Sequence, residues 1–120
     1  MKNLTFEATF ETPQVVLDGN AGVLEFSGRS HPEDSLIFYK PILNWVSDYL
    51  KSPAPSTRIV IRLEYFNTST SKMILSLLNK FENTENTVVD WFHFGEDEDM
   101  LECGKEFSEL INLPFTFHTI

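Results

Sequence analysis

The chain has 120 residues, of which 42% are hydrophobic and 13% aromatic, and its formal net charge is −9. This length and apolar content suffice for one packed core, which excludes a wholly disordered protein, and we expect a single domain over residues 1–120. No apolar run approaches the roughly 18 residues of a membrane span, no secretory signal opens the chain, and the single cysteine, Cys103, cannot form an internal disulfide. These features predict a cytoplasmic protein without membrane insertion.

The negative charge is concentrated in one part of the sequence. Residues 1–81 carry equal numbers of acidic and basic residues, whereas residues 82–109 carry ten acidic residues against one basic residue, Lys105. Such a surface repels nucleic-acid phosphates, so no nucleic-acid partner is expected. An acidic surface can serve solubility alone or attract a basic protein partner, and the charge by itself leaves both interpretations open.

Three short β-rich segments open the chain, at residues 5–9, 15–18 and 23–27. Asp18-Gly19-Asn20, between the last two, is typical of a hairpin turn. Ser30 and Glu33 then have the spacing of a capping box, which predicts that a helix begins here. Its apolar face carries side chains three and four positions apart, and the helix ends before the prolines at 53 and 55. The residues of this face are Phe38, Ile42, Trp45, Val46 and Tyr49.

The rest of the chain alternates strand and helix patterns. Apolar and polar side chains alternate along residues 57–65, as they do in a strand with one buried face. A helix follows from Thr68 or Ser69, a strand covers residues 88–94, an acidic third helix covers residues 97–110, and a strand at residues 115–118 closes the chain. This order predicts an α/β (α+β) fold, in which a mixed sheet of five to six strands packs against three helices.

No segment carries the signature of an enzyme. The Gly-x-Gly-x-x-Gly, phosphate-loop, Gly-x-Ser-x-Gly and Cys-x-x-Cys motifs are absent. The three histidines lie far apart, and Met100 and Leu101 interrupt the acidic run at residues 96–99 before it could supply the spaced ligands of a calcium loop. We therefore expect no catalytic residue, no cofactor and no metal, and explain these acidic residues by capping and the helix dipole.

The segment between the fourth strand and the second helix is unusual, because it offers more hydroxyl groups than a helix cap needs. One side chain suffices to cap the helix, and the others lower helix propensity in its first turn. A phosphoryl group here would be stabilised by free backbone N–H groups and by the helix dipole. An ordinary capped helix and a phosphorylated switch are both compatible with this chemistry. The residues concerned are Asn67, Thr68, Ser69, Thr70, Ser71 and Lys72.

Four runs, in order along almost the whole chain, resemble the SiaC family of bacterial regulatory phosphoproteins. They are GRSHPE at residues 28–33, FYKPILNW at 38–45, EYFNTSTSK at 64–72 and DEDMLECG at 97–104. The Tyr-Phe-Asn-Thr-Ser segment is the most specific part of the resemblance. Two positions differ from the usual pattern, since Thr70 replaces a serine and His31 an apolar residue.

The resemblance implies a fold similar to the STAS-type anti-sigma-factor antagonists and a role in a partner-switching circuit. A SiaB-like kinase would phosphorylate Thr68, and a SiaA-like phosphatase of the PP2C type would remove the phosphate. The unmodified protein would bind and activate a SiaD-like diguanylate cyclase, and the resulting cyclic di-GMP would alter aggregation and biofilm formation. The surface recognised by these partners would include Asn67, Ser69, Thr70, Ser71 and Lys72.

Two alternatives are compatible with the same sequence. The chain could act on another kinase or a sigma regulator, as an anti-sigma-factor antagonist does. It could also be a small ligand-binding enzyme with a pocket near Tyr65 and His93, which would show turnover without any added partner.

Overall fold

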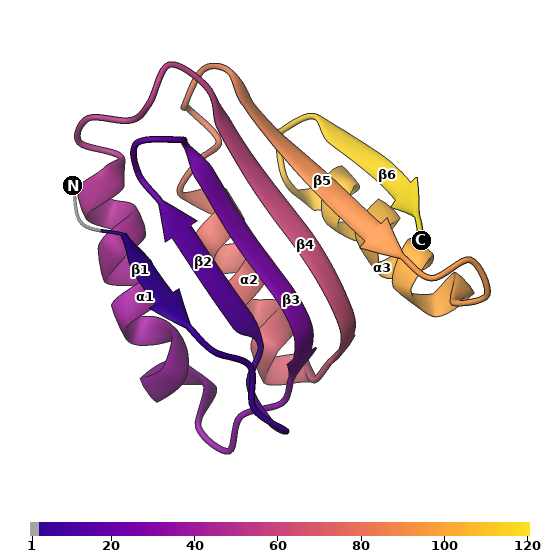
Figure 1. Cartoon of the computed structure of the whole chain (residues 1–120). Helices are drawn as coiled ribbons and strands as arrows, with labels where there is room; N and C mark the ends of the chain where they lie inside the picture. Colours follow the sequence, from indigo (N-terminus) through magenta and orange to yellow (C-terminus); the bar gives the residue numbers. More distant parts are fainter. Residues whose placement is uncertain (1–2) are drawn as a thin grey trace.

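The computed structural model describes residues 3–120 and contains one six-stranded sheet whose strands follow their order in the sequence (Figure 1). β1 (Leu4–Phe6), β2 (Gln14–Asp18) and β3 (Val23–Ser30) are antiparallel neighbours. β4 (Thr57–Phe66), β5 (Thr87–His93) and β6 (Phe115–Thr119) continue from β3 as parallel strands. The predicted mixed sheet with three helices is confirmed.

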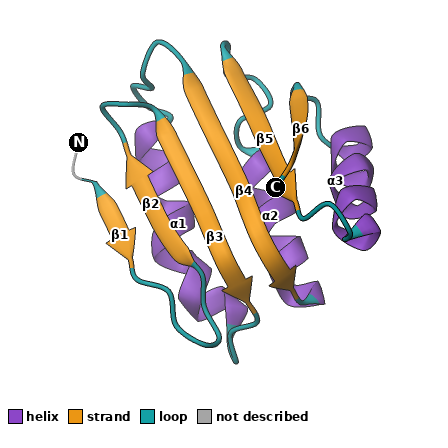
Figure 2. Cartoon of the chain, turned by 45° about the vertical axis from the view of Figure 1, so that its right-hand side comes forward, coloured by secondary structure: helices purple, strands orange, loops and turns teal. Residues whose placement is uncertain are grey.

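All three helices cover the same face of this sheet. α1 (Ser35–Tyr49), α2 (Thr68–Asn79) and α3 (Glu98–Leu110) each connect two neighbouring parallel strands. Such crossovers are right-handed, and because the strand order never reverses, successive helices fall on one side, as Figures 1 and 2 show. Within residues 3–120, the other face of the sheet carries no helix.

The core lies between the sheet and the helices, and β4 shows how the sequence builds it. Ile59, Ile61 and Leu63 are buried toward the helices, whereas Arg58 and Arg62, which alternate with them, are exposed. This is the alternation predicted for the strand. The largest fully buried side chains are Trp91, Tyr39, Tyr49, Phe26 and Phe81.

The predicted hairpin between β2 and β3 is confirmed. The Asp18 carboxylate accepts hydrogen bonds from the N–H groups of Asn20 and Ala21, at 3.1 and 3.0 Å. The Gly22 N–H donates to the Asp18 carbonyl at 2.9 Å and closes the turn. The hydrogen bonds that the Asp18 side chain accepts from the next residues therefore fix the turn, as the sequence predicts.

Helix α1 begins later than predicted, and the capping-box prediction is wrong. The N-cap is Asp34, whose carboxylate accepts from the Ile37 N–H at 3.1 Å. Ser30 is instead the buried last residue of β3, and its hydroxyl is bonded to Tyr39 at 2.7 Å. Ser30 and Glu33 therefore have the spacing of a capping box but do not form one, because both residues precede the helix.

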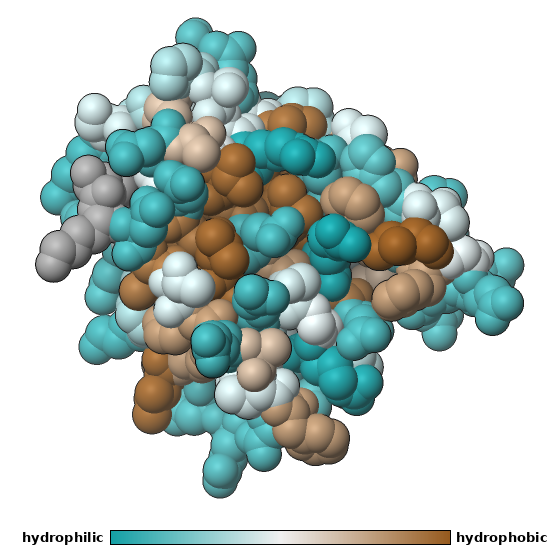
Figure 3. Space-filling view, in the orientation of Figure 1, coloured by the Kyte–Doolittle hydropathy of each residue, from teal (hydrophilic) through white to brown (hydrophobic). Residues whose placement is uncertain are grey.

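The face of the sheet without helices mixes hydrophobic and hydrophilic side chains (Figure 3). Phe92, for example, lies beneath the Arg62 guanidinium, which is 4.9 Å from the centre of the ring. Among residues 3–120, none of the helices has the length and apolar content to cross a bilayer.

Candidate functional site

The predicted switch turn lies where β4 ends and α2 begins, at the carboxyl end of the parallel strands (Figure 1). Asn67 is the N-cap of α2: its side-chain oxygen accepts from the Thr70 N–H at 2.9 Å and from the Ser69 hydroxyl at 3.1 Å. Since Asn67 does the capping, the hydroxyl residues that follow are not needed for it.

Thr68 is the first residue of α2, and its side chain is exposed. Within the part of the chain that the structure describes, the Thr68 hydroxyl makes no hydrogen bond. The first turn of a helix presents free N–H groups and the positive end of the dipole. A phosphoryl group on Thr68 would therefore be stabilised without disturbing any existing side-chain bond.

The neighbouring polar side chains either form hydrogen bonds of their own or lie apart from the Thr68 hydroxyl. Ser69 is bonded to Ser35 through their hydroxyls at 2.6 Å, which links the first turns of α2 and α1. The Ser71 hydroxyl donates to the Thr68 carbonyl at 2.8 Å. Lys72 is exposed and supplies a positive charge one turn into the helix. Thr68 thus differs from Ser69 and Ser71 in having a free, exposed hydroxyl.

Thr70 is fully buried, so the prediction that its side chain forms part of the exposed surface is wrong. Its hydroxyl donates to the Ser30 carbonyl at 3.0 Å and lies 2.9 Å from the Ser30 hydroxyl. Ser30 in turn bonds the Tyr39 hydroxyl. Burial raises the pKa of Tyr39 to about 12, although its hydrogen bonds with Ser30 and Thr70 oppose the shift. Thr70 therefore anchors α2 from beneath the turn.

Exposed apolar side chains border the turn. Phe10 is 79% exposed, Ile37 in the first turn of α1 is 71% exposed and Tyr65 is 45% exposed. The ring of His31 lies edge-on between Phe10 and Tyr65, with centroids 5.6 and 5.8 Å away. Its Nε2 is buried and has no hydrogen-bond partner within residues 3–120. Exposed aromatic groups of this kind are typical of protein-binding surfaces.

The enzyme alternative places one pocket near both Tyr65 and His93. Tyr65 borders a cavity, but His93 is not among the residues that line it. The His93 ring is instead bonded to the Phe94 carbonyl at 3.0 Å and to Thr119 at 3.3 Å. Across the described residues, no three His, Cys, Asp or Glu side chains are grouped as a metal ion would require.

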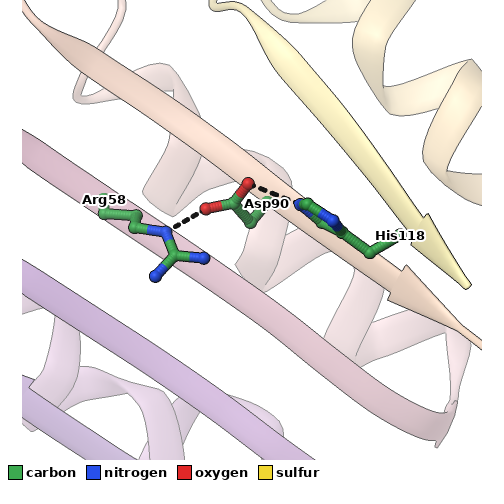
Figure 4. Close-up of polar contacts among 3 residues, drawn as sticks. All are labelled: Arg58, Asp90 and His118. Atoms are coloured by element: carbon green, nitrogen blue, oxygen red, sulfur yellow. Dashed lines mark hydrogen bonds and ion pairs between the residues drawn. The ribbon is translucent and has the colours of Figure 1, made fainter. Parts of the chain in front are cut away.

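The sequence did not reveal a second polar cluster, on the uncovered face of the sheet (Figure 4). The carboxylate of Asp90 on β5 accepts from Arg58 Nε on β4 and, at 2.8 Å, from His118 Nε2 on β6. Burial acts to raise the pKa of Asp90, but the hydrogen bonds from His118 and Arg58 outweigh it and hold the pKa below its ordinary value. The cluster ties three strands together, because its members lie on β4, β5 and β6.

Sequence comparisons identify relatives along nearly the whole chain. The profile of the SiaC family regulatory phosphoproteins matches residues 6–120. An uncharacterized protein of Pseudomonas aeruginosa strain UCBPP-PA14 is 29% identical over 119 residues, which cover 96% of this chain and 94% of the relative.

Solved structures of SiaC from Pseudomonas aeruginosa share the fold. One superposes with a TM-score of 0.90 at 26% identity over 100% of both chains. The structure of apo-SiaC gives 0.86 at 29% identity, covering 98% of this chain and 99% of the other. A chain from the crystal structure of the diguanylate cyclase SiaD in complex with its activator SiaC gives 0.90 at 26% identity, with coverage of 98% and 99%. This chain therefore belongs to the SiaC family of regulatory phosphoproteins.

Proposed function

We propose that this chain is a phosphorylation-gated activator of a diguanylate cyclase. The unphosphorylated form binds the cyclase and activates it, and phosphorylation of Thr68 ends the interaction. The observation that carries the proposal is the free, exposed hydroxyl of Thr68 at the start of α2. The other hydroxyl groups of this turn are hydrogen-bonded or buried. The similarity to SiaC, which is known in complex with the cyclase SiaD, supports the choice of partner.

The proposed mechanism is electrostatic and steric. A phosphate adds a charge of about −1.5 to −2 and considerable bulk at the first turn of α2. A partner packed on the apolar residues beside the turn, Ile37 and Tyr65, would have to strip water from that phosphate, which is unfavourable without compensating bonds. The phosphate therefore blocks close approach while the domain stays folded.

The proposed circuit supplies the modification from outside, since this chain acts by binding. A SiaB-like kinase places the phosphate on Thr68, and a SiaA-like phosphatase of the PP2C type removes it. Asn67, Ser69, Ser71 and Lys72 form the polar surroundings that these enzymes recognise, with Thr70 supporting them from the core. The output is cyclic di-GMP, which controls aggregation and biofilm formation.

The first experiment is phosphorylation by the SiaB-like kinase of the same genome, with ATP, followed by intact-protein and peptide mass spectrometry. We expect one phosphate, on Thr68, that is lost in Thr68→Ala. Ser69→Ala is the matched control, because it removes a neighbouring hydroxyl and should keep the phosphate. An absent phosphate, or one on any residue other than Thr68, would contradict the proposal.

The second experiment measures the output. Thr68→Ala should bind and activate the cyclase whether or not the kinase has acted, whereas the wild-type chain should lose binding after phosphorylation. Thr68→Asp should imitate the phosphate only in part, because a carboxylate has less charge and fewer oxygens. Failure of Thr68→Ala to bind the cyclase would show that the docking mechanism is wrong.

A further inference from the structure

A small pocket lies next to the switch turn, between the end of β4 and the first turns of α3. Its volume is about 290 Å³. The apolar part of its lining comes from Tyr65 and Phe66 on β4 and from Met100 and Cys103 on α3. Pockets for small molecules usually measure about 300–1,000 Å³, so this one has the size for a single long side chain. We call it the Tyr65 pocket.

The polar residues of the lining, Glu64, Asp97 and Asp99, are all acidic. Glu64 also borders a second cavity, which Arg62 helps to line. Among residues 3–120, no lysine, arginine or histidine nitrogen lies within ion-pair distance of these three groups. The negative potential reaches the apolar lining as well: burial raises the pKa of the Cys103 thiol, and the charges of Glu106, Asp99 and Asp97 raise it further.

Helix capping accounts for only part of this charge. Asp97 is the N-cap of α3 and accepts from the Met100 N–H at 2.9 Å, and Asp99 belongs to the first turn, where the dipole favours it. Glu64 lies on a different element, at an irregularity where Gly28 pairs with Leu63 and Arg29 with Tyr65. This bulge leaves Glu64 without a partner on β3. No helix explains its presence in the pocket.

We propose that the Tyr65 pocket receives a lysine or arginine side chain of the cyclase partner. The aliphatic stem of such a side chain would pack on the apolar lining, and its charged end would meet the three carboxylates. The proposal rests on the proposed function, for which it names a contact. It also gives the acidic surface of this chain a specific use in addition to solubility.

The position of the pocket fits a partner that covers the switch. Tyr65 precedes Thr68 by three residues, which span at most about 11 Å. The same Tyr65 ring contacts His31, and through it the exposed Phe10, so the pocket continues the apolar surface beside the turn. A phosphate on Thr68 would not repel a cationic side chain, so the pocket contributes affinity and the phosphate controls access. The two roles can be separated by experiment.

The sharpest test compares Glu64→Gln with Glu98→Gln. Both are exposed glutamates and undergo the same chemical change, but only Glu64 lines the pocket. We expect Glu64→Gln to weaken binding of the diguanylate cyclase from the same genome about three- to tenfold, and Glu98→Gln less than about twofold. The difference should shrink as salt rises from about 0.05 to about 0.5 M. Equal effects of the two variants would contradict the proposal that the Tyr65 pocket binds a cationic side chain. They would show instead that the acidic surface attracts the cyclase without a specific contact.

A second test uses the chain's one cysteine, Cys103, and needs no variant. Iodoacetamide labelling of Cys103, followed by peptide mass spectrometry, should be about tenfold slower in the complex with the cyclase than in the free chain. Unchanged labelling while the cyclase is bound would show that the cyclase does not fill the Tyr65 pocket. The proposed function would still stand in that case. Wild-type chain that fails to bind the cyclase at all would overturn the proposed function itself.

Discussion

At the residue scale, the switch turn places two threonines with identical chemistry in opposite environments. Thr68 and Thr70 are separated by about 200° around the helix axis, since each residue advances by about 100°. Thr68 consequently faces solvent, while Thr70 is buried against Ser30. The same substitution at the two positions should therefore separate signalling from stability.

Thr70→Val keeps the shape of the side chain and removes its hydroxyl. The Ser30 carbonyl and hydroxyl would then lose a buried partner, so we expect the free energy of unfolding to fall by about 1–3 kcal/mol. Thr68→Val, the matched control, should change stability by less than about 0.5 kcal/mol and abolish phosphorylation. Urea denaturation measures the first effect and mass spectrometry the second. Equal stability losses would contradict the separate roles inferred for the two threonines.

At the element scale, local contacts decide what the sequence can reveal. The strands, helices and hairpin turn follow from periodicity and from nearby bonds such as Asn67 to Thr70, so they and the position of Thr68 could be predicted. Contacts between distant residues could not. Ser30 mimics a helix cap in sequence, yet its hydroxyl is taken by Tyr39 and by Thr70, which lies 40 residues away. The burial of Thr70 depends on the same distant contacts, so the sequence alone does not predict it.

The Asp90 cluster is the clearest example of a feature hidden from the sequence, since its members lie 32 and 28 residues apart and meet only when three strands align. Asp90 has a lowered pKa in the folded chain, so it stabilises the fold above its ordinary pKa of 3.8. This stabilisation is lost as the pH falls through the folded-state pKa.

Asp90→Asn should therefore lower the free energy of unfolding by about 1–3 kcal/mol at neutral pH, because the ionised hydrogen bonds to Arg58 and His118 are lost. The difference from wild type should shrink at acidic pH, where the wild-type carboxyl is protonated too. Asp48→Asn is the control, since the Asp48–Lys51 pair lies on the surface and contributes little. Denaturation across pH measures both. A loss that does not vary with pH would show that the charge of Asp90 is not the cause.

Helix α3 owes its position to a close approach between helix and sheet. A Cβ atom on Gly104 would lie 2.6 Å from the Trp91 indole, whose Nε1 donates to the Met100 carbonyl at 3.0 Å. Gly104→Ala should therefore destabilise the fold by about 1–3 kcal/mol, despite the better helix propensity of alanine. Glu109→Ala, on the exposed side of the same helix, should not destabilise. Urea denaturation followed by tryptophan fluorescence tests the pair. Gain of stability in Gly104→Ala would contradict the tight packing.

At the scale of the whole molecule, the net charge of −9 acts against folding while it favours a basic partner. On α3, Glu98, Glu102 and Glu106 follow one another at four-residue spacing, which brings like charges together. The Lys105–Glu102 pair, at 3.9 Å and exposed, offsets little of this repulsion. The helix that lines the Tyr65 pocket is thus under electrostatic repulsion, and among these three glutamates only Glu98, in the first turn, is also favoured by the helix dipole.

Salt should consequently stabilise the fold and weaken the complex. Raising NaCl to about 0.5 M shortens the Debye length to about 4 Å, which screens the glutamates of α3 from one another, so the thermal midpoint should rise. The variant Glu102→Gln with Glu106→Gln should start with a higher midpoint at low salt and respond less to NaCl. A midpoint that falls with salt in the wild-type chain would show that attractive pairs, such as Arg58–Asp90, outweigh the repulsion. Because the expected effects on folding and on cyclase binding have opposite signs, weaker binding at high salt could not be attributed to loss of the fold.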